Sequence, residues 1–120
     1  GGSHSFLAGA SDLDLAGVVG FYGSLRPRRA GAPDVLAQAG KIRGPVLGLF
    51  GEADEGIPLD QVAEFEERLG AAGVDAEIVT YPGAPHSFFD RKQEEFAEAS
   101  ADAWRRVLGF LEQVGASVAA

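Results

Sequence analysis

Apolar residues along the chain gather in short runs that are separated by polar, glycine-rich and proline-rich segments. Residues 16–22 and 45–50 form near-continuous apolar runs bounded by turn residues, a pattern typical of strands buried on both faces of a parallel sheet. Residues 75–81 alternate and are rich in β-branched side chains, which also favours a strand. The pattern therefore predicts three strands.

The segments that follow the second and third of these strands carry the spacing of amphipathic helices. From Leu59 onward, Val62, Phe65 and Leu69 recur every three or four residues among charged side chains, which predicts a helix that ends near the glycines at positions 70 and 73. Residues 93–114 predict a longer helix that packs across the sheet. Its apolar side is expected to consist of Phe96, Ala103, Val107, Phe110, Leu111 and Val114, with Trp104 beside them.

Two shorter helical segments are expected nearer the start of the chain. Residues 3–10 are small and partly apolar, and they follow a Gly1–Gly2 pair that suits a tight turn. Pro33 is placed to open a short helix through residue 39. Strands that alternate with helices predict an α/β fold, with about three parallel strands and flanking helices, in a single domain over residues 1–120. Such a sheet leaves an edge unpaired beside its first strand, so the domain is expected to be partial.

Composition and charge narrow the range of partners. The chain has 10 Lys and Arg against 18 Asp and Glu, a net charge of −8 that opposes binding to the phosphate backbone of nucleic acids. No apolar run approaches the roughly 20 residues that cross a bilayer, so no membrane partner is expected. The chain has no Cys, which excludes disulfides and a thiol nucleophile within these residues. The sequence implies no cofactor or metal, and the cytoplasm is the default expectation for the compartment.

Two titratable residues follow neighbouring strands. Asp54 comes just after the second strand and His86 just after the third, each in a loop that contains glycine and proline. In an open α/β sheet such loops emerge at the same carboxyl edge, so the two side chains can meet there. A carboxylate that accepts the Nδ1 proton of a histidine leaves Nε2 as a general base, which acyl transfer by a triad requires. The alternative is that Asp54 caps a turn and His86 bonds a loop carbonyl, as polar residues in such loops commonly do.

The sequences of both loops resemble the dienelactone hydrolase family. Residues 51–58 (GEADEGIP) are similar to the family's acid loop and residues 81–88 (YPGAPHSF) to its histidine loop, in the same order along the chain. Residues 1–2 resemble the end of the family's G-x-C-x-G-G turn, and residues 19–23 (VGFYG) resemble its next strand. The resemblance extends from residue 1 to the last helix. It implies the C-terminal portion of an α/β-hydrolase fold, with His86 as general base and Asp54 orienting it.

The same resemblance implies that the nucleophile, Cys or Ser, lies two residues before Gly1. The oxyanion-hole donors of such hydrolases would also lie upstream. Ser3 is a poor substitute, because a nucleophile elbow needs a strand before it and a small residue after it; the N-cap of the following helix is the simpler role. His4 is expected on the surface of that helix. We therefore expect little turnover by the isolated chain.

Further residues near His86 are candidates for substrate contact. Tyr22 ends a strand at the expected active edge, where lining the pocket and packing are equally good roles for it. Arg91 resembles, with a shift of one residue, the arginine with which the family holds a substrate carboxylate. The alternative for Arg91 is an exposed position paired with a neighbouring carboxylate such as Asp90. Phe88 and Phe89 are either an apolar wall of the pocket or packing residues.

Two hypotheses of different classes follow. In the first, the chain is part of a hydrolase of small esters or lactones, and its nucleophile comes from an upstream segment or from a partner chain that completes the sheet. In the second, it is a catalytically inactive α/β half-domain that acts as an interaction or oligomerisation module through its open sheet edge. A stable oligomer without activity would favour the second hypothesis.

Overall fold

The computed structural model describes residues 1–11, 13, 15–27, 29–32 and 34–119, and its helices and strands alternate along the chain as expected. The elements in chain order are α1 (Gly2–Gly9), β1 (Val18–Phe21), α2 (Val35–Gln38), the 3-10 turn η1 (Ala39–Lys41), β2 (Val46–Gly51), α3 (Leu59–Ala71), β3 (Ala76–Tyr81) and α4 (Ala97–Ala119). The three expected strands are confirmed. The helix start expected at Pro33 lies outside the described residues; α2 has Asp34 as its N-cap, with a side chain that accepts the N–H of Ala37 at 3.2 Å.

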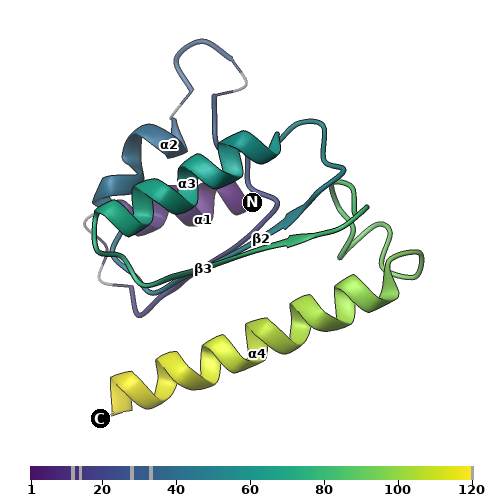
Figure 1. Ribbon diagram of the computed structural model, residues 1–120. Helices are drawn as coiled ribbons and strands as arrows, with labels where there is room; N and C mark the ends of the chain where they lie inside the picture. The colour runs from purple at the N-terminus through teal and green to yellow at the C-terminus, as the bar shows by residue number, and fades with distance from the viewer. Residues whose placement is uncertain (12, 14, 28, 33, 120) are drawn as a thin grey trace.

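The described strands form one parallel sheet in the order β1-β2-β3. Val46 of the central strand pairs with Val18 on one side and Ala76 on the other. Every residue of β2 is buried, as its continuous apolar run predicts, and β1 and β3 are the edges. Helices α1, α2 and α3 cover one face and α4 covers the other, and the loops after β2 and β3 leave the sheet at the same end (Figure 1). The expected α/β fold is therefore confirmed, and both candidate loops lie at one edge.

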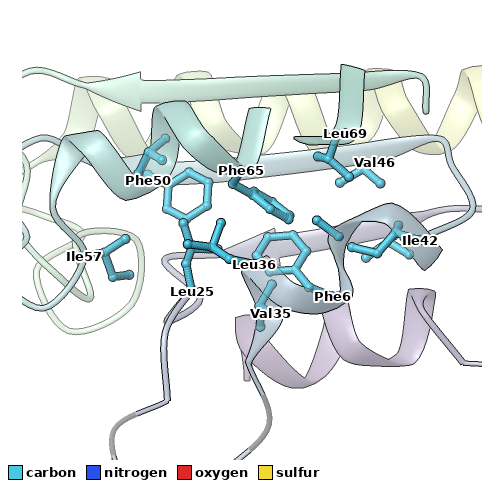
Figure 2. Packing of buried hydrophobic residues seen from close by; sticks show 13 residues of the cluster. Phe6, Leu25, Val35, Leu36, Ile42, Val46, Phe50, Ile57, Phe65 and Leu69 are labelled. Atoms are coloured by element: carbon cyan, nitrogen blue, oxygen red, sulfur yellow. The ribbon is translucent and has the colours of Figure 1, made fainter. Parts of the chain in front are cut away.

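The larger hydrophobic core lies between the sheet and the helices on the first face. Phe6 of α1, Phe50 of β2 and Phe65 of α3 are almost completely buried, and the Phe6 ring centroid lies 6.2 Å from that of Phe50 and 4.9 Å from that of Phe65 (Figure 2). Ile57, from the loop after β2, is buried in the same cluster. This core therefore attaches the loop that carries Asp54 to the scaffold.

On the other face, α4 packs on the sheet through a narrower stripe than expected. Ala103 and Val107 are buried against β2, but Leu111, expected on the apolar side, is 54% exposed. Leu111 follows the half-exposed Trp104 and Leu108 at helical spacing, so it lies on a side of α4 that the described elements leave largely uncovered. The helix also begins at Ala97, four residues later than the sequence predicted, and residues 93–96 form turns.

Candidate active site

The acid loop, residues 51–58, holds Asp54 in a buried and well-defined position. The Asp54 side chain is only 3% exposed, and its Oδ1 accepts the backbone N–H of Gly56 at 3.0 Å. The Asp54 carbonyl accepts the N–H of Ile57, whose side chain is buried in the core. The turn thus uses one carboxylate oxygen and leaves Oδ2 for another donor.

Backbone hydrogen bonds join the acid loop to the end of β3 and to the segment that follows it, residues 82–96, which is called the histidine loop from here on. The N–H groups of Glu52 and Ala53 donate to the carbonyls of Tyr81 and Ala84, both at 2.9 Å. A Cβ at Gly51 would lie 2.2 Å from the Ala84 carbonyl oxygen, so only glycine permits this approach of the two backbones. These contacts fix the distance between the loops independently of the Asp54 and His86 side chains.

His86 meets Asp54 at this junction. Its Nδ1 lies 2.7 Å from Oδ2 of Asp54, and its side chain is 44% exposed. An ionised carboxylate can only accept, so this contact selects the tautomer with the proton on Nδ1 and leaves the Nε2 lone pair available. The sequence-based alternatives for Asp54 turn out to be compatible, because one oxygen caps the turn and the other meets the histidine.

Tyr22 lies beside the imidazole. Its ring centroid is 4.8 Å from that of His86, and burial, followed by the nearby Asp90 carboxylate, raises the pKa of Tyr22 to about 12. Tyr22 and Ser87, next to His86, both have positive φ values, 35° and 65°. Such backbone conformations are uncommon for residues other than glycine and concentrate at functional sites.

The first turn of α1 lies directly against the end of β1. A Cβ at Gly2 would lie 2.3 Å from the carbonyl oxygen of Phe21, and one at Gly23 would lie 2.6 Å from the Gly2 carbonyl carbon. The glycines therefore allow the start of α1 to reach the strand end that carries Tyr22. Gly1 is the N-cap of this helix and Ser3 lies inside it, so the expectation of a Ser3 N-cap is wrong: the turn begins two residues earlier, where glycine accommodates the contact. His4 is exposed on the helix, as expected.

The remaining candidates differ in their surroundings. Arg91 is exposed, its backbone N–H donates to Oδ1 of Asp90, and within the described residues its side chain forms no ion pair. Phe88 is fully buried against Tyr22 and Tyr81, so it is a packing residue. Phe89 is half-buried. The role of Arg91 in substrate binding stays a prediction.

Glu52 is a contributor that sequence reasoning missed. Its Oε1 accepts the N–H of Gly83 at 3.3 Å and so adds a side-chain link between the two loops. Its position directly after β2, at the carboxyl edge of the sheet, is a signal that could have identified it.

In the parts of the chain that the structure describes, His, Asp and Glu do not gather in any group of three or more that could hold a metal ion. None of the described helices combines the length and the apolar character needed to span a membrane.

A model of the dienelactone hydrolase family matches residues 1–115, which is nearly the whole chain. The chain belongs to the dienelactone hydrolase family. A Yersinia pestis protein named "Putative carboxymethylenebutenolidase" is 34% identical over 123 residues, covering 98% of this chain and 45% of the relative. A Saccharolobus solfataricus protein of the same name is 37% identical over 107 residues, covering 88% of this chain and 38% of the relative. The chain thus spans a little under half the length of these dienelactone hydrolase relatives.

Solved structures agree with this assignment. The crystal structure titled "Putative Dienelactone Hydrolase" from Klebsiella pneumoniae is 34% identical with a TM-score of 0.84, and the match covers 94% of this chain and 48% of that one. Thermogutta terrifontis esterase 2 shares the fold, with a TM-score of 0.69 at 23% identity over 84% of this chain and 41% of its own. The sheet and its flanking helices therefore match about half of the Klebsiella pneumoniae structure.

Proposed function

We propose that this chain supplies the histidine and the acid of a catalytic triad in a hydrolase of small esters or lactones. The observation that carries the proposal is the 2.7 Å contact between Nδ1 of His86 and Oδ2 of a buried Asp54, beside a partly exposed imidazole face. In this role Nε2 of His86 takes the proton of the attacking nucleophile and gives it to the leaving alkoxide as the acyl-enzyme forms. It then takes a proton from the water that hydrolyses the acyl-enzyme and returns it to the nucleophile. Asp54 orients the ring and stabilises the imidazolium throughout.

In this proposal the nucleophile, Cys or Ser, and the oxyanion donors belong to a segment that precedes Gly1, and residues 1–120 are the C-terminal part of the domain. Two observations support it. The chain covers 45% of the Yersinia pestis relative. The start of α1 also packs against the end of β1 next to Tyr22, which contacts His86, so a residue shortly before Gly1 would enter the site beside the imidazole.

The substrate would be a small lactone or ester that carries a carboxylate. The name of the relatives, carboxymethylenebutenolidase, describes a butenolide with a carboxymethylene group. An exposed Arg91 on the histidine loop supplies a guanidinium that suits bidentate binding of that carboxylate. Tyr22 would form one wall of the pocket against which the lactone ring packs.

The first test is the coding sequence immediately upstream of Gly1, read in frame. We expect it to encode a strand that ends in Gly-x-Cys-x or Gly-x-Ser-x, placing the nucleophile two residues before Gly1. A start codon immediately before Gly1, or an upstream segment without a nucleophile, would contradict the proposal.

The second test is kinetic and uses the complete gene product, meaning this chain together with any residues encoded upstream of Gly1. His86→Ala is expected to lower kcat for a butenolide and for a p-nitrophenyl ester by a factor on the order of 10³ or more. His4→Ala, which removes an exposed imidazole from α1, is the matched control and should leave kcat unchanged. Hydrolysis by His86→Ala at the wild-type rate would refute the assignment of the base.

A further inference from the structure

Hydrogen bonds attach the histidine loop to α4 on both sides of His86. Before the loop, the Tyr81 hydroxyl donates to Oδ2 of Asp102 at 2.7 Å. After His86, the Ser100 hydroxyl, which is buried, donates to the carbonyl of Phe88 at 3.1 Å. Ser100 and Asp102 both lie near the start of α4. The segment that carries His86 is therefore held at both ends by the same helix, through side chains that do not touch the imidazole.

The Asp102 end of this attachment is itself held by cations. Arg106 donates through Nε to the same Oδ2 at 2.7 Å, and Arg105 approaches Oδ1 at 3.3 Å. The hydrogen bonds from Arg106 and Tyr81 lower the pKa of Asp102 to about 2. Burial, and then Asp102, raise the pKa of Tyr81 well above its usual value of 10.0. Around neutral pH the Asp102 carboxylate therefore stays ionised and accepts hydrogen bonds, and the Tyr81 hydroxyl stays protonated and donates.

Tyr81 is also the residue at which the two loops of the site join. Its backbone carbonyl accepts the N–H groups of Glu52 and Ala84, one from each loop. Its buried ring packs on Phe88 at a centroid distance of 5.2 Å. A shift of Tyr81 would thus move the acid loop and the histidine loop with respect to each other.

We propose that Tyr81 and Asp102 are positioning residues, whose hydrogen bond holds the end of β3 in the place where His86 Nδ1 meets Asp54. The kinetic part of this inference rests on the proposed hydrolase function, whereas the geometric part does not. Misplacement of a catalytic group by about 1 Å can cost up to 10²-fold in rate, so loss of a single remote hydroxyl is sufficient to have a measurable effect.

The principal variant is Tyr81→Phe in the complete gene product, which removes the hydroxyl and keeps the ring. We expect kcat to fall about tenfold with KM within about twofold, since the substrate contacts are unchanged. Asp102→Leu removes the acceptor and should reproduce this loss, and the double variant should add little to it. Asp102→Asn keeps an oxygen for Tyr81 and should restore kcat to within about threefold of wild type. Glu77→Gln, which removes only the negative charge of the outer partner of Arg106 at 3.4 Å, is the control and should leave kcat unchanged.

A second readout does not depend on turnover. The proton on Nδ1 of His86, bonded to Asp54, should give a downfield proton resonance, assigned by its loss in His86→Gln. We expect Tyr81→Phe to shift or broaden this resonance at temperatures where the variant is folded, and Glu77→Gln to leave it in place. A Tyr81→Phe variant with wild-type kcat and resonance, altered only in its melting temperature, would overturn the proposal. If wild type hydrolyses neither ester nor lactone but the resonance moves in Tyr81→Phe, the proposed function fails and the positioning role stands.

Discussion

At the scale of single residues, the Asp54 carboxylate uses its two oxygens for different tasks. Oδ1 accepts the Gly56 N–H and maintains the turn, while Oδ2 faces Nδ1 of His86. A substitution that preserves the first contact and alters the second therefore separates turn geometry from proton chemistry.

Asp54→Asn makes this separation. The amide oxygen can still accept from Gly56, but the amide nitrogen would face Nδ1 and favour the tautomer with its proton on Nε2, which is no longer a base. In the complete gene product we expect kcat to fall by a factor on the order of 10⁴, as for the same change in the Ser-His-Asp triad, with little change in melting temperature. Asp60→Asn, at an exposed carboxylate that accepts a backbone N–H at 3.0 Å, should leave kcat unchanged. A kcat within tenfold of wild type for Asp54→Asn would count against the orienting role.

Tyr22 offers a test by pH. Its pKa is raised from 10.0 to about 12, so the fold favours the neutral phenol. The stability that this contributes is fully present below pH 10 and is lost as pH rises towards 12. A spectrophotometric difference titration between wild type and Tyr22→Phe should show tyrosinate from Tyr22 only near the upper value. Asp90→Asn should move this midpoint towards 10, because the Asp90 carboxylate contributes to the shift. A wild-type midpoint near that of free tyrosine would show that the ring is not buried as described.

The pairing of Asp54 and His86 could be predicted from the sequence for a simple reason. Loops that follow adjacent parallel strands emerge at one edge, and the strands were evident from their apolar runs. Glu52 follows β2 at the same edge and was within reach of this argument, but the role of Asp102 could not be predicted, because it depends on which way the face of α4 turns. The N-cap at Gly1 instead of Ser3 depends likewise on a backbone contact with Gly23 that no local pattern encodes.

At the scale of elements, the junction of the two loops requires the absence of a side chain at Gly51. Ala at this position would bring a methyl group to 2.2 Å from the Ala84 carbonyl oxygen, which must move away. We expect Gly51→Ala to lower the free energy of unfolding by about 1–3 kcal/mol and to reduce kcat, because it pushes the acid loop from the histidine loop.

Gly70→Ala is the matched control for this prediction. Gly70 lies in α3, and a Cβ there would meet no heavy atom within 4 Å. The substitution should raise the free energy of unfolding by about 0.5–1 kcal/mol, because alanine is the better helix former, and should leave kcat unchanged. Chemical denaturation of both variants measures the difference. Equal stability of Gly51→Ala and wild type would mean that the loops are not in the close contact described.

The two long helices differ in how well the sequence pattern predicted their buried faces. The apolar spacing of α3 predicted its bounds well, since Val62, Phe65 and Leu69 all face the core. For α4 the apolar positions exceed those that the described strands and loops bury. Leu111 therefore remains exposed although its spacing matches the buried side, and periodicity alone could not reveal the width of the surface that α4 meets.

At the scale of the whole molecule, one side of the structure combines an open strand edge with exposed apolar side chains. Within the described residues β1 pairs only with β2. Trp104 on α4 reaches Phe21 of β1 through Phe89, with centroid distances of 6.1 and 4.7 Å. Leu108 and Leu111 follow Trp104 at helical spacing, so they extend the same side of α4, and these three α4 residues are each about half exposed. Unpaired strand edges and contiguous apolar patches both favour association.

We therefore expect the 120-residue chain, expressed by itself, to self-associate in a concentration-dependent way that light scattering detects. Leu108→Glu places a charge in the apolar stripe of α4 and should shift the population towards monomer, whereas Leu59→Glu, at a leucine that is also about half exposed but lies on α3 across the sheet, should not. A monodisperse monomer at all concentrations would contradict the prediction for the isolated chain.

The complete gene product tests whether upstream residues cover this side of the structure. If residues upstream of Gly1 pair with β1 and cover α4, it should stay monomeric at concentrations where the isolated chain associates, and Leu108→Glu should then destabilise its fold instead of dissolving an oligomer.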